Sequence, residues 1–193
     1  MDLQLKDGWI EAITGSMYAG KTEELLRRIK RIEYAKRTVY VFKPKLDDRY
    51  SANEVISHDM TSTKSFVIEN AKEIYKYLEI KPYAIAIDEA QFFDKDLIDV
   101  CEDLADQGIR VIVAGLDCNF RGEPFGVMPN LLARAEYVTK LNAICQVCGA
   151  PATRTQRLIN GKPAHYQDPE ILVGAKEQYE ARCRHCHVVL GKK

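Results

Sequence analysis

The chain has 193 residues, of which 46% are hydrophobic and 29% charged, which favours one full-sized globular domain with a smaller appendage over a disordered or fibrous chain. Its 28 Lys and Arg residues balance 28 Asp and Glu residues, so a nucleic-acid partner is not expected, because phosphate contacts normally require a basic excess. Apolar runs fall short of the ~18 residues of a membrane-spanning helix, and the N-terminus lacks a signal-peptide pattern, so we expect a cytoplasmic protein without a membrane partner.

Strand-like and helix-like segments alternate through the first 142 residues. Apolar runs without polar alternation, typical of strands buried on both faces, lie at 9–15, 38–44, 83–88 and 109–117. Helix-like runs separate them, and this alternation favours an α/β fold in which helices cover both faces of a parallel sheet. A polar segment at 47–65 is long enough to predict a functional loop.

Three segments carry helical signals. From Lys21 onward, apolar residues recur at every third or fourth position, and residues 69–80 also look helical. At 94–108, Asp94 stands where an N-cap is expected and Gly108 follows the last turn. Cys101 lies on the apolar face of this helix, which places the cysteine in the core.

The first functional motif is a glycine-rich loop, GSMYAGKT, between the strand at 9–15 and the first helix. Backbone N–H groups of such a loop surround phosphate oxygens at a helix N-terminus. Lys21 would reach the β- and γ-phosphates, and the hydroxyl of Thr22 would bind Mg²⁺. The sequence therefore predicts that ATP and Mg²⁺ are bound by Gly15, Ser16, Met17, Tyr18, Ala19, Gly20, Lys21 and Thr22.

A second motif, YAIAIDEAQFF, ends the strand at 83–88 with two acidic residues. Asp88 can hold Mg²⁺ beside the phosphate loop, and Glu89 can accept a proton from an attacking oxygen. Such pairs also occur in ATP-driven motors, where the glutamate activates water, and as simple caps of the next segment. Asp59, in the polar segment, is either a second Mg²⁺ ligand or a solvated side chain.

Two Cys-x-x-Cys pairs mark the C-terminal part of the chain, and each aims two thiols at one point. Four thiolates complete a tetrahedral structural zinc site, predicted to consist of Cys145, Cys148, Cys183 and Cys186. Reduced buried thiols and a redox pair are the alternatives, and either His185 or His187 can substitute for Cys186 on the metal. Cys118 lies in a loop and has no assigned role.

After residue 142 the alternating strand-like and helix-like runs give way to a segment bracketed by the two Cys-x-x-Cys pairs. This change predicts two domains, an ATP-binding domain at 1–142 and a zinc-binding domain at 143–193. In the second, Asn160-Gly161 between strand-like runs predicts a hairpin. The 34 residues between the cysteine pairs exceed the usual spacing of a zinc ribbon. The zinc site would therefore fix the base of a long loop that closes over a ligand.

The motifs together resemble those of the zinc-containing, cellular-type thymidine kinases along essentially the whole chain. The motifs that carry the resemblance are GSMYAGKT, ISHD, IDEAQFF, GLDCNFRGEPFG, KLNAICQVCG and ILVGAKEQYEARCRHC. The resemblance implies a P-loop (RecA-like) parallel sheet flanked by helices, with a small zinc-binding domain and a lasso-like lid loop. It also implies transfer of the γ-phosphate of ATP to the 5′-hydroxyl of thymidine, a homotetramer, and feedback inhibition by thymidine triphosphate.

The resemblance also assigns residues by position. Glu89 matches the family's catalytic base and Asp88 its magnesium-associated carboxylate, and Ala90 and Gln91 complete this ATP-binding stretch. Phe120 matches the aromatic residue that packs on the pyrimidine. The substrate-binding residues implied by the resemblance are Phe92, Leu116, Phe120, Phe125, Thr155, Glu170, Ile171, Leu172, Val173, Gly174 and Tyr179.

Two other functions are compatible with the motifs alone. The acidic pair and the cysteines fit a nucleic-acid-dependent ATPase with a zinc ribbon, although the zero net charge and the short chain argue against it. A zinc-stabilised nucleotide sensor without catalysis is the third reading. The acceptor of the phosphate, whether nucleoside, water or none, distinguishes the three.

Overall fold

The structure, a computed structural model, describes residues 8–45, 54–56, 62–171 and 177–192. Four of the predicted site residues lie outside these ranges, namely Asp59, Leu172, Val173 and Gly174. Among the helices that the structure describes, none combines the length and the apolar character needed to cross a membrane.

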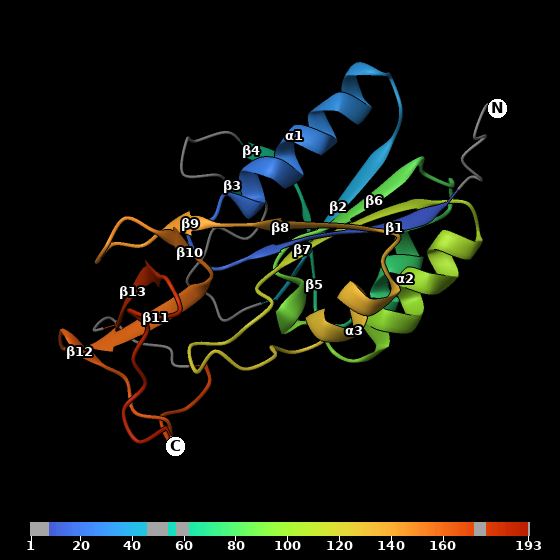
Figure 1. Ribbon diagram of the computed structural model, residues 1–193. Helices are drawn as coiled ribbons and strands as arrows, with labels where there is room; N and C mark the ends of the chain where they lie inside the picture. Colours follow the sequence, from blue (N-terminus) through green and yellow to red (C-terminus); the bar gives the residue numbers. More distant parts are fainter. Residues whose placement is uncertain (1–7, 46–53, 57–61, 172–176, 193) are drawn as a thin grey trace.

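A six-stranded parallel sheet forms the centre of the molecule (Figure 1). Its strands, in spatial order, are β5 (Phe66–Ile68), β2 (Val39–Pro44), β6 (Ala84–Ile87), β7 (Arg110–Gly115), β1 (Trp9–Gly15) and β8 (Tyr137–Leu141). The four predicted strands correspond to β1, β2, β6 and β7. Strand β7 separates the strand that leads into the phosphate loop, β1, from the strand that ends in the acidic pair, β6. The predicted P-loop (RecA-like) α/β fold is confirmed.

Helices cover both faces of the sheet, as predicted (Figure 1). Helix α1 (Lys21–Tyr34) packs on one face; the 3₁₀ helix η1 (Ala71–Tyr77), α2 (Asp96–Asp106) and α3 (Met128–Arg134) pack on the other. In β6, the isoleucines contact the side of α2 while the alanines contact α1, and all four residues are fully buried. Both faces of the strand therefore require apolar side chains, which explains the uninterrupted apolar run in the sequence.

Helix α2 ends as predicted, but its N-cap is Lys95 and not the predicted Asp94. The Asp94 carboxylate accepts a hydrogen bond from the backbone N–H of Asp96 at 3.0 Å, which satisfies a free donor of the first turn. After the last turn, Gly108 has a positive φ of 81° and donates its N–H to the carbonyl of Ala105 at 2.9 Å. Cys101 is fully buried in the core between α2 and the sheet, in agreement with its predicted position.

The prediction of a helix at 69–80 is only partly right. The segment forms the shorter 3₁₀ helix η1, in which Glu73 N–H donates to the carbonyl of Asn70, three residues earlier, at 3.2 Å. Its buried residues Ala71 and Ile74 are three positions apart, which matches the three-residue turn of a 3₁₀ helix. The sequence analysis does not predict α3 and β8.

The C-terminal region, which begins with β9 at Ala143, contains two small antiparallel sheets. In one, β9 (Ala143–Ile144) pairs with β10 (Pro151–Ala152); in the other, β11 (Arg154–Ile159) lies between β12 (Lys162–Pro163) and β13 (Glu177–Arg182). Asn160 and Gly161 both have positive φ, 51° and 76°, so the predicted hairpin is confirmed, with a turn of type I′.

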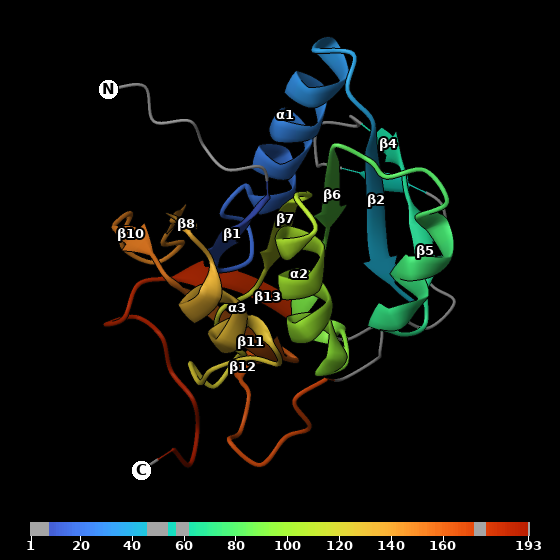
Figure 2. The same cartoon turned by 90° about the vertical axis from the view of Figure 1, so that its right-hand side faces the viewer.

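The C-terminal region lies at the end of the sheet where β1 leads into α1, in both views (Figures 1 and 2). A third small antiparallel sheet, β3 (Glu54–Ile56) with β4 (Ser62–Lys64), falls within the polar segment that the sequence predicts as a loop. The domain boundary at residue 143 stays a prediction.

Candidate functional site

The phosphate loop connects the end of β1 to the start of α1, and its shape depends on two glycines. Gly15 has a φ of 150°, and a Cβ atom there would lie 2.4 Å from the carbonyl oxygen of Leu141. Gly20 has a φ of 81° and immediately precedes α1. Across the loop, Lys21 Nζ donates to the carbonyl of Ser16 at 2.9 Å. A side chain at either glycine would distort the backbone that surrounds this lysine.

Acidic residues from the end of β6 face the start of α1. Thr22 Oγ1 donates to Asp88 Oδ2 at 3.4 Å, and the backbone N–H of Glu89 donates to Asp88 Oδ1 at 2.9 Å. Burial, together with the negative charge of Glu89, raises the pKa of Asp88 to about 7. Burial lowers the pKa of Lys21, although Glu89, Asp88 and Asp117 oppose the shift. Hydroxyl and carboxylate oxygens are the ligands that Mg²⁺ prefers, so Thr22 and Asp88 fit this metal.

Glu89 has an unusual backbone and a fixed side chain. Its φ of 52° is left-handed, which a residue with a Cβ adopts at a cost. Gln91 Nε2 donates to Glu89 Oε2 at 2.5 Å, while Gln91 Oε1 accepts the backbone N–H of Leu116 at 3.0 Å. Gly115 leaves room for this amide, because a Cβ there would lie 2.6 Å from Gln91 Oε1. Gln91 therefore orients Glu89, whereas the side chain of Ala90 lies in the core.

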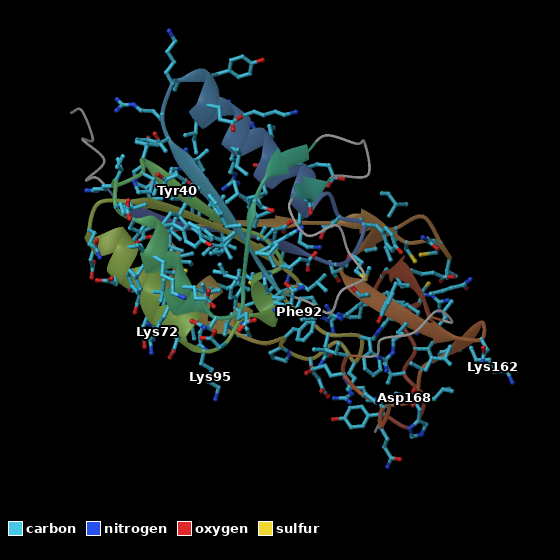
Figure 3. All side chains as sticks on the ribbon, turned by 180° about the vertical axis from the view of Figure 1, so that it is seen from behind. Tyr40, Lys72, Phe92, Lys95, Lys162 and Asp168 are labelled. Atoms are coloured by element: carbon cyan, nitrogen blue, oxygen red, sulfur yellow. The ribbon has the colours of Figure 1, made fainter. Side chains whose placement is uncertain are left out.

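Three aromatic side chains lie in the segments that follow β6 and β7, namely Phe92, Phe120 and Phe125. The rings of Phe92 and Phe125 meet edge to face with centroids 5.5 Å apart. Phe120 is also buried, and its carbonyl lies 2.8 Å from Nε2 of His187. Figure 3 shows Phe92 near the junction between the six-stranded sheet and the C-terminal region. The segments after β6 and β7 thus provide flat apolar surfaces, which suit a planar ring.

The C-terminal region contacts the phosphate loop directly. Ser16 Oγ donates to the carbonyl of Ala152 at 3.3 Å, and the backbone N–H of Met17 donates to Thr155 Oγ1 at 3.0 Å. Thr155 is only 4% exposed, so water does not compete for this bond. Thr155, predicted to support a substrate, thus lies against the predicted ATP loop.

Two side chains join the segment after β7 to residues 168–170. Asn119 Nδ2 donates to Glu170 Oε1 at 2.5 Å, and Arg121 Nη2 donates to the carbonyl of Asp168 at 2.7 Å. The segment around Phe120 and the chain leading toward the predicted lid are therefore held together at two points.

The four predicted zinc ligands form a cluster in which all Sγ atoms lie within 4.8 Å of one another, consisting of Cys145, Cys148, Cys183 and Cys186. The Sγ atoms of Cys148 and Cys183 are 3.6 Å apart, close to the roughly 3.8 Å between corners of a tetrahedron with Zn–S bonds of about 2.3 Å. Burial opposes ionisation of Cys145, but neighbouring backbone N–H groups outweigh it and lower its pKa to about 6. Neither His185 nor His187 belongs to the cluster among the described residues. The donor set fits zinc.

One acidic residue of the site escaped the sequence analysis. Asp117 is 7% exposed, forms an ion pair with Lys140 at 2.6 Å, and acts electrostatically on Lys21. Asp117 follows the end of β7 as Asp88 follows the end of β6. The criterion that selected Asp88, an acidic residue at the end of a buried strand, would also have selected Asp117.

The remaining predicted site residues lie at the margin of this arrangement. Tyr18 is 48% exposed and Ile171 54% exposed, while Tyr179 is half-buried on β13. The structure thus brings together the phosphate loop, the acidic pair, the aromatic residues and Thr155. The side chains of Tyr18, Ile171 and Tyr179 are more open to solvent.

Comparison with known proteins gives a family match and likenesses to many solved structures, among them the two described below. A sequence model described as thymidine kinase matches residues 8–187. The ATPase DotB of Legionella pneumophila shares 15% identity at a TM-score of 0.46, and the match covers 76% of this chain but 44% of that one. The flagellar accessory protein FlaH of Methanocaldococcus jannaschii shares 13% identity at a TM-score of 0.48, with 76% of each chain covered. Since the family match spans nearly the whole chain, the chain belongs to the thymidine kinase family.

Proposed function

We propose that this kinase transfers the γ-phosphate of ATP to the 5′-hydroxyl of thymidine and releases thymidine monophosphate. The observation that carries the proposal is the hydrogen bond from Met17 N–H to the hydroxyl of Thr155. It joins the ATP-binding loop to β11, so an acceptor held by the C-terminal region would lie directly against the phosphates of the donor. Family membership points to thymidine as that acceptor.

The phosphate loop would bind and align ATP. Backbone N–H groups of the loop, other than the Met17 N–H that donates to Thr155, would surround the phosphate oxygens, and Lys21 would neutralise charge that develops on the transferred group. Mg²⁺, held through Thr22 and Asp88, would supply further charge neutralisation at the β- and γ-phosphates. Phosphoryl transfer needs mainly alignment and charge neutralisation, which this set of groups can provide.

Glu89 would accept the proton of the 5′-hydroxyl. A positioned carboxylate typically contributes about 10²–10⁴-fold in rate by this means. Gln91 fixes the carboxylate with one end of its amide and is itself fixed by the backbone of Leu116 with the other. Glu89 is therefore oriented before the substrate arrives.

The thymine ring would pack among the aromatic residues. Phe92, which follows Glu89 by three residues, packs against Phe125, and these rings together with the buried Phe120 offer apolar surface for the base. Residues 170–171 begin the predicted lid, whose backbone would read the hydrogen-bonding edge of the base. Closure of such a lid would exclude water, which otherwise competes with the nucleoside for the phosphate.

Zinc would have a structural role. A structural zinc site contributes on the order of 10 kcal/mol to the folding of its module. Cys145 follows β9 and Cys183 follows β13, so a metal bound by the four thiolates would fix both small sheets and keep Thr155 against the phosphate loop. The proposal includes the division at residue 143, a homotetramer, inhibition by thymidine triphosphate, and a cytoplasmic location.

A product assay tests the proposed function. The purified protein would be incubated with Mg²⁺ and ATP and, in parallel, with thymidine, deoxyuridine, deoxycytidine, deoxyadenosine, or no acceptor, and the products separated by chromatography. We expect thymidine monophosphate in the first reaction and little ADP without an acceptor; a Lys21→Ala variant serves as the control for contaminating kinases. ADP released at one rate in every reaction, and stimulated by DNA or RNA, would instead identify a nucleic-acid-dependent ATPase.

A further inference from the structure

Arg157 is a buried cation with incomplete partners. It lies in β11, its side chain is 0% exposed, and Nη1 donates to the carbonyl of Pro169 at 2.7 Å. Its Nε and Nη2 atoms have no hydrogen-bond partner, and no ion pair joins it to a carboxylate, in the part of the chain that the structure describes. Burying a charged group without a countercharge is costly, so this arginine is not explained by stability.

The guanidinium of Arg157 supports the ring of Phe120. Its central carbon lies 3.6 Å from the ring centroid, a close cation–π contact in a site from which water is largely excluded. The backbone of Phe120 is held separately, because its carbonyl lies 2.8 Å from Nε2 of His187. Both the ring and the backbone of Phe120 are therefore fixed by groups from the C-terminal region.

The strand register places Arg157 centrally in the proposed acceptor site. Arg157 is two positions after Thr155, so the two side chains leave β11 on the same face. Directly opposite Arg157 on β13 is Tyr179. The face that carries the contact to the phosphate loop thus also carries the arginine.

We infer that Arg157 is a positioning residue that sets the shape of the nucleoside pocket. The inference rests on the proposed function. The guanidinium holds the Phe120 ring on one side and the backbone of Pro169 and Glu170 on the other, with Nη1 3.5 Å from the carbonyl of Glu170. It fixes the distance between the aromatic surface and the start of the lid before the nucleoside binds. Residues that violate the rules of core packing in this way are expected at functional sites.

Arg157→Met separates a positioning role from a structural one. Methionine retains the apolar stem but removes the charge, the planar group and the donors. The loss of one charged hydrogen bond and of the ring support should raise the KM for thymidine about 10- to 100-fold, with kcat within about threefold of wild type and the KM for ATP unchanged. The temperature of unfolding should stay the same or rise, because a buried charge that has no countercharge among the described residues is removed.

The experiment compares wild type with Arg157→Met, Arg157→Lys and Arg154→Met. Arg154 is a matched control: it lies on the same strand, is only partly buried, and points to the opposite face from Arg157. Steady-state kinetics with thymidine and with ATP varied in turn, calorimetric titration with thymidine, and thermal unfolding would be measured for each protein. Arg157→Lys, which keeps the charge but not the plane, should bind thymidine with intermediate affinity, and Arg154→Met should match wild type.

Three results would overturn the inference. A KM for thymidine that Arg157→Met leaves within twofold of wild type would show that the arginine does not shape the pocket. Equal rises in the KM for thymidine and ATP would point to a general distortion. A variant that unfolds early or fails to fold would show that the arginine is structural. Absence of thymidine turnover in wild type itself would instead refute the proposed function.

Discussion

Replacing the proposed base by its amide is the sharpest test of the catalytic arrangement. In Glu89→Gln the side chain keeps its size, and its amide oxygen can still accept the hydrogen bond from Gln91 Nε2. The variant loses only the negative charge and the ability to take up a proton. Among the described residues no hydrogen bond joins this side chain to the phosphate loop, and its charge acts on Lys21 together with those of Asp88 and Asp117, which remain, so ATP affinity should change little.

The expected loss is confined to turnover. General base catalysis is worth about 10²–10⁴-fold, so kcat should fall by that factor, which corresponds to about 3–5 kcal/mol in activation free energy. The KM for thymidine should change by less than about threefold, because the missing interaction is made only in the transition state. Because Glu89 and Asp88 are adjacent acidic groups, removing the charge of Glu89 should also lower the pKa of Asp88.

The assay measures thymidine monophosphate formation over a range of pH, with ATP binding measured by calorimetry. Glu79→Gln, which makes the same chemical change at an exposed residue, is the matched control. Near-normal turnover by Glu89→Gln would refute the assignment of the base. A parallel loss of ATP affinity would show that the substitution disturbs the phosphate loop rather than proton transfer.

Three further outcomes are expected. Cys183→Ser should lose bound zinc, measured by atomic absorption, and weaken thymidine binding far more than ATP binding; equal losses would mean that zinc supports the whole fold. Gly115→Ala should displace Gln91, because the added Cβ would lie 2.6 Å from its Oε1, and should lower kcat at least tenfold while ATP affinity stays normal. Glu11 is buried, which by itself would raise its pKa, but hydrogen bonds, chiefly from Arg110, outweigh burial and lower the pKa. The stabilisation that Glu11 provides is therefore complete above the ordinary pKa of a glutamate, and it is lost as the pH falls through the lowered pKa of the folded protein. Glu11→Gln should therefore cost about 3 kcal/mol in urea unfolding at neutral pH, and the difference from wild type should shrink below about pH 4.5; a constant difference would contradict the ion-pair explanation.

The helices and strands that could be predicted are those in which the pattern of apolar residues along the sequence shows which faces are buried. Strands β6 and β7 are apolar on both faces, and α1 and α2 have a single apolar stripe, so local patterns identify them. Strand β8 is at the edge of the sheet, and its exposed Tyr137 and Val138 give no such pattern. Only its pairing with β1 makes it a strand, and that pairing is not visible in the local sequence.

The site could be predicted where each part of it carries a short local motif, as the two Cys-x-x-Cys pairs do. The phosphate loop and the acidic pair are of this kind. The contact between Met17 and Thr155 joins residues 138 positions apart, and the local sequence around either residue gives no signal that predicts it. Arg157 stands in a polar-looking run, TRTQRL, and would be taken for an exposed residue, although it is fully buried. Its environment depends on Phe120 and Pro169, which the fold alone brings to it.

The position of β1 in the sheet has a consequence for the order of folding. Its Thr14 hydroxyl bonds the carbonyl of Gly115, 101 residues later, and its Ile10 N–H bonds the carboxylate of Glu136, 126 residues later. Strand β1 precedes the other described strands in the chain, yet it acquires its neighbours β7 and β8 only after residues 110–115 and 137–141 have been synthesised. Such non-local pairing is slow, because a long loop must close before the contacts form. A nascent chain that ends before β7 lacks the frame of the phosphate loop, so ATP binding should appear only after β7 has been synthesised.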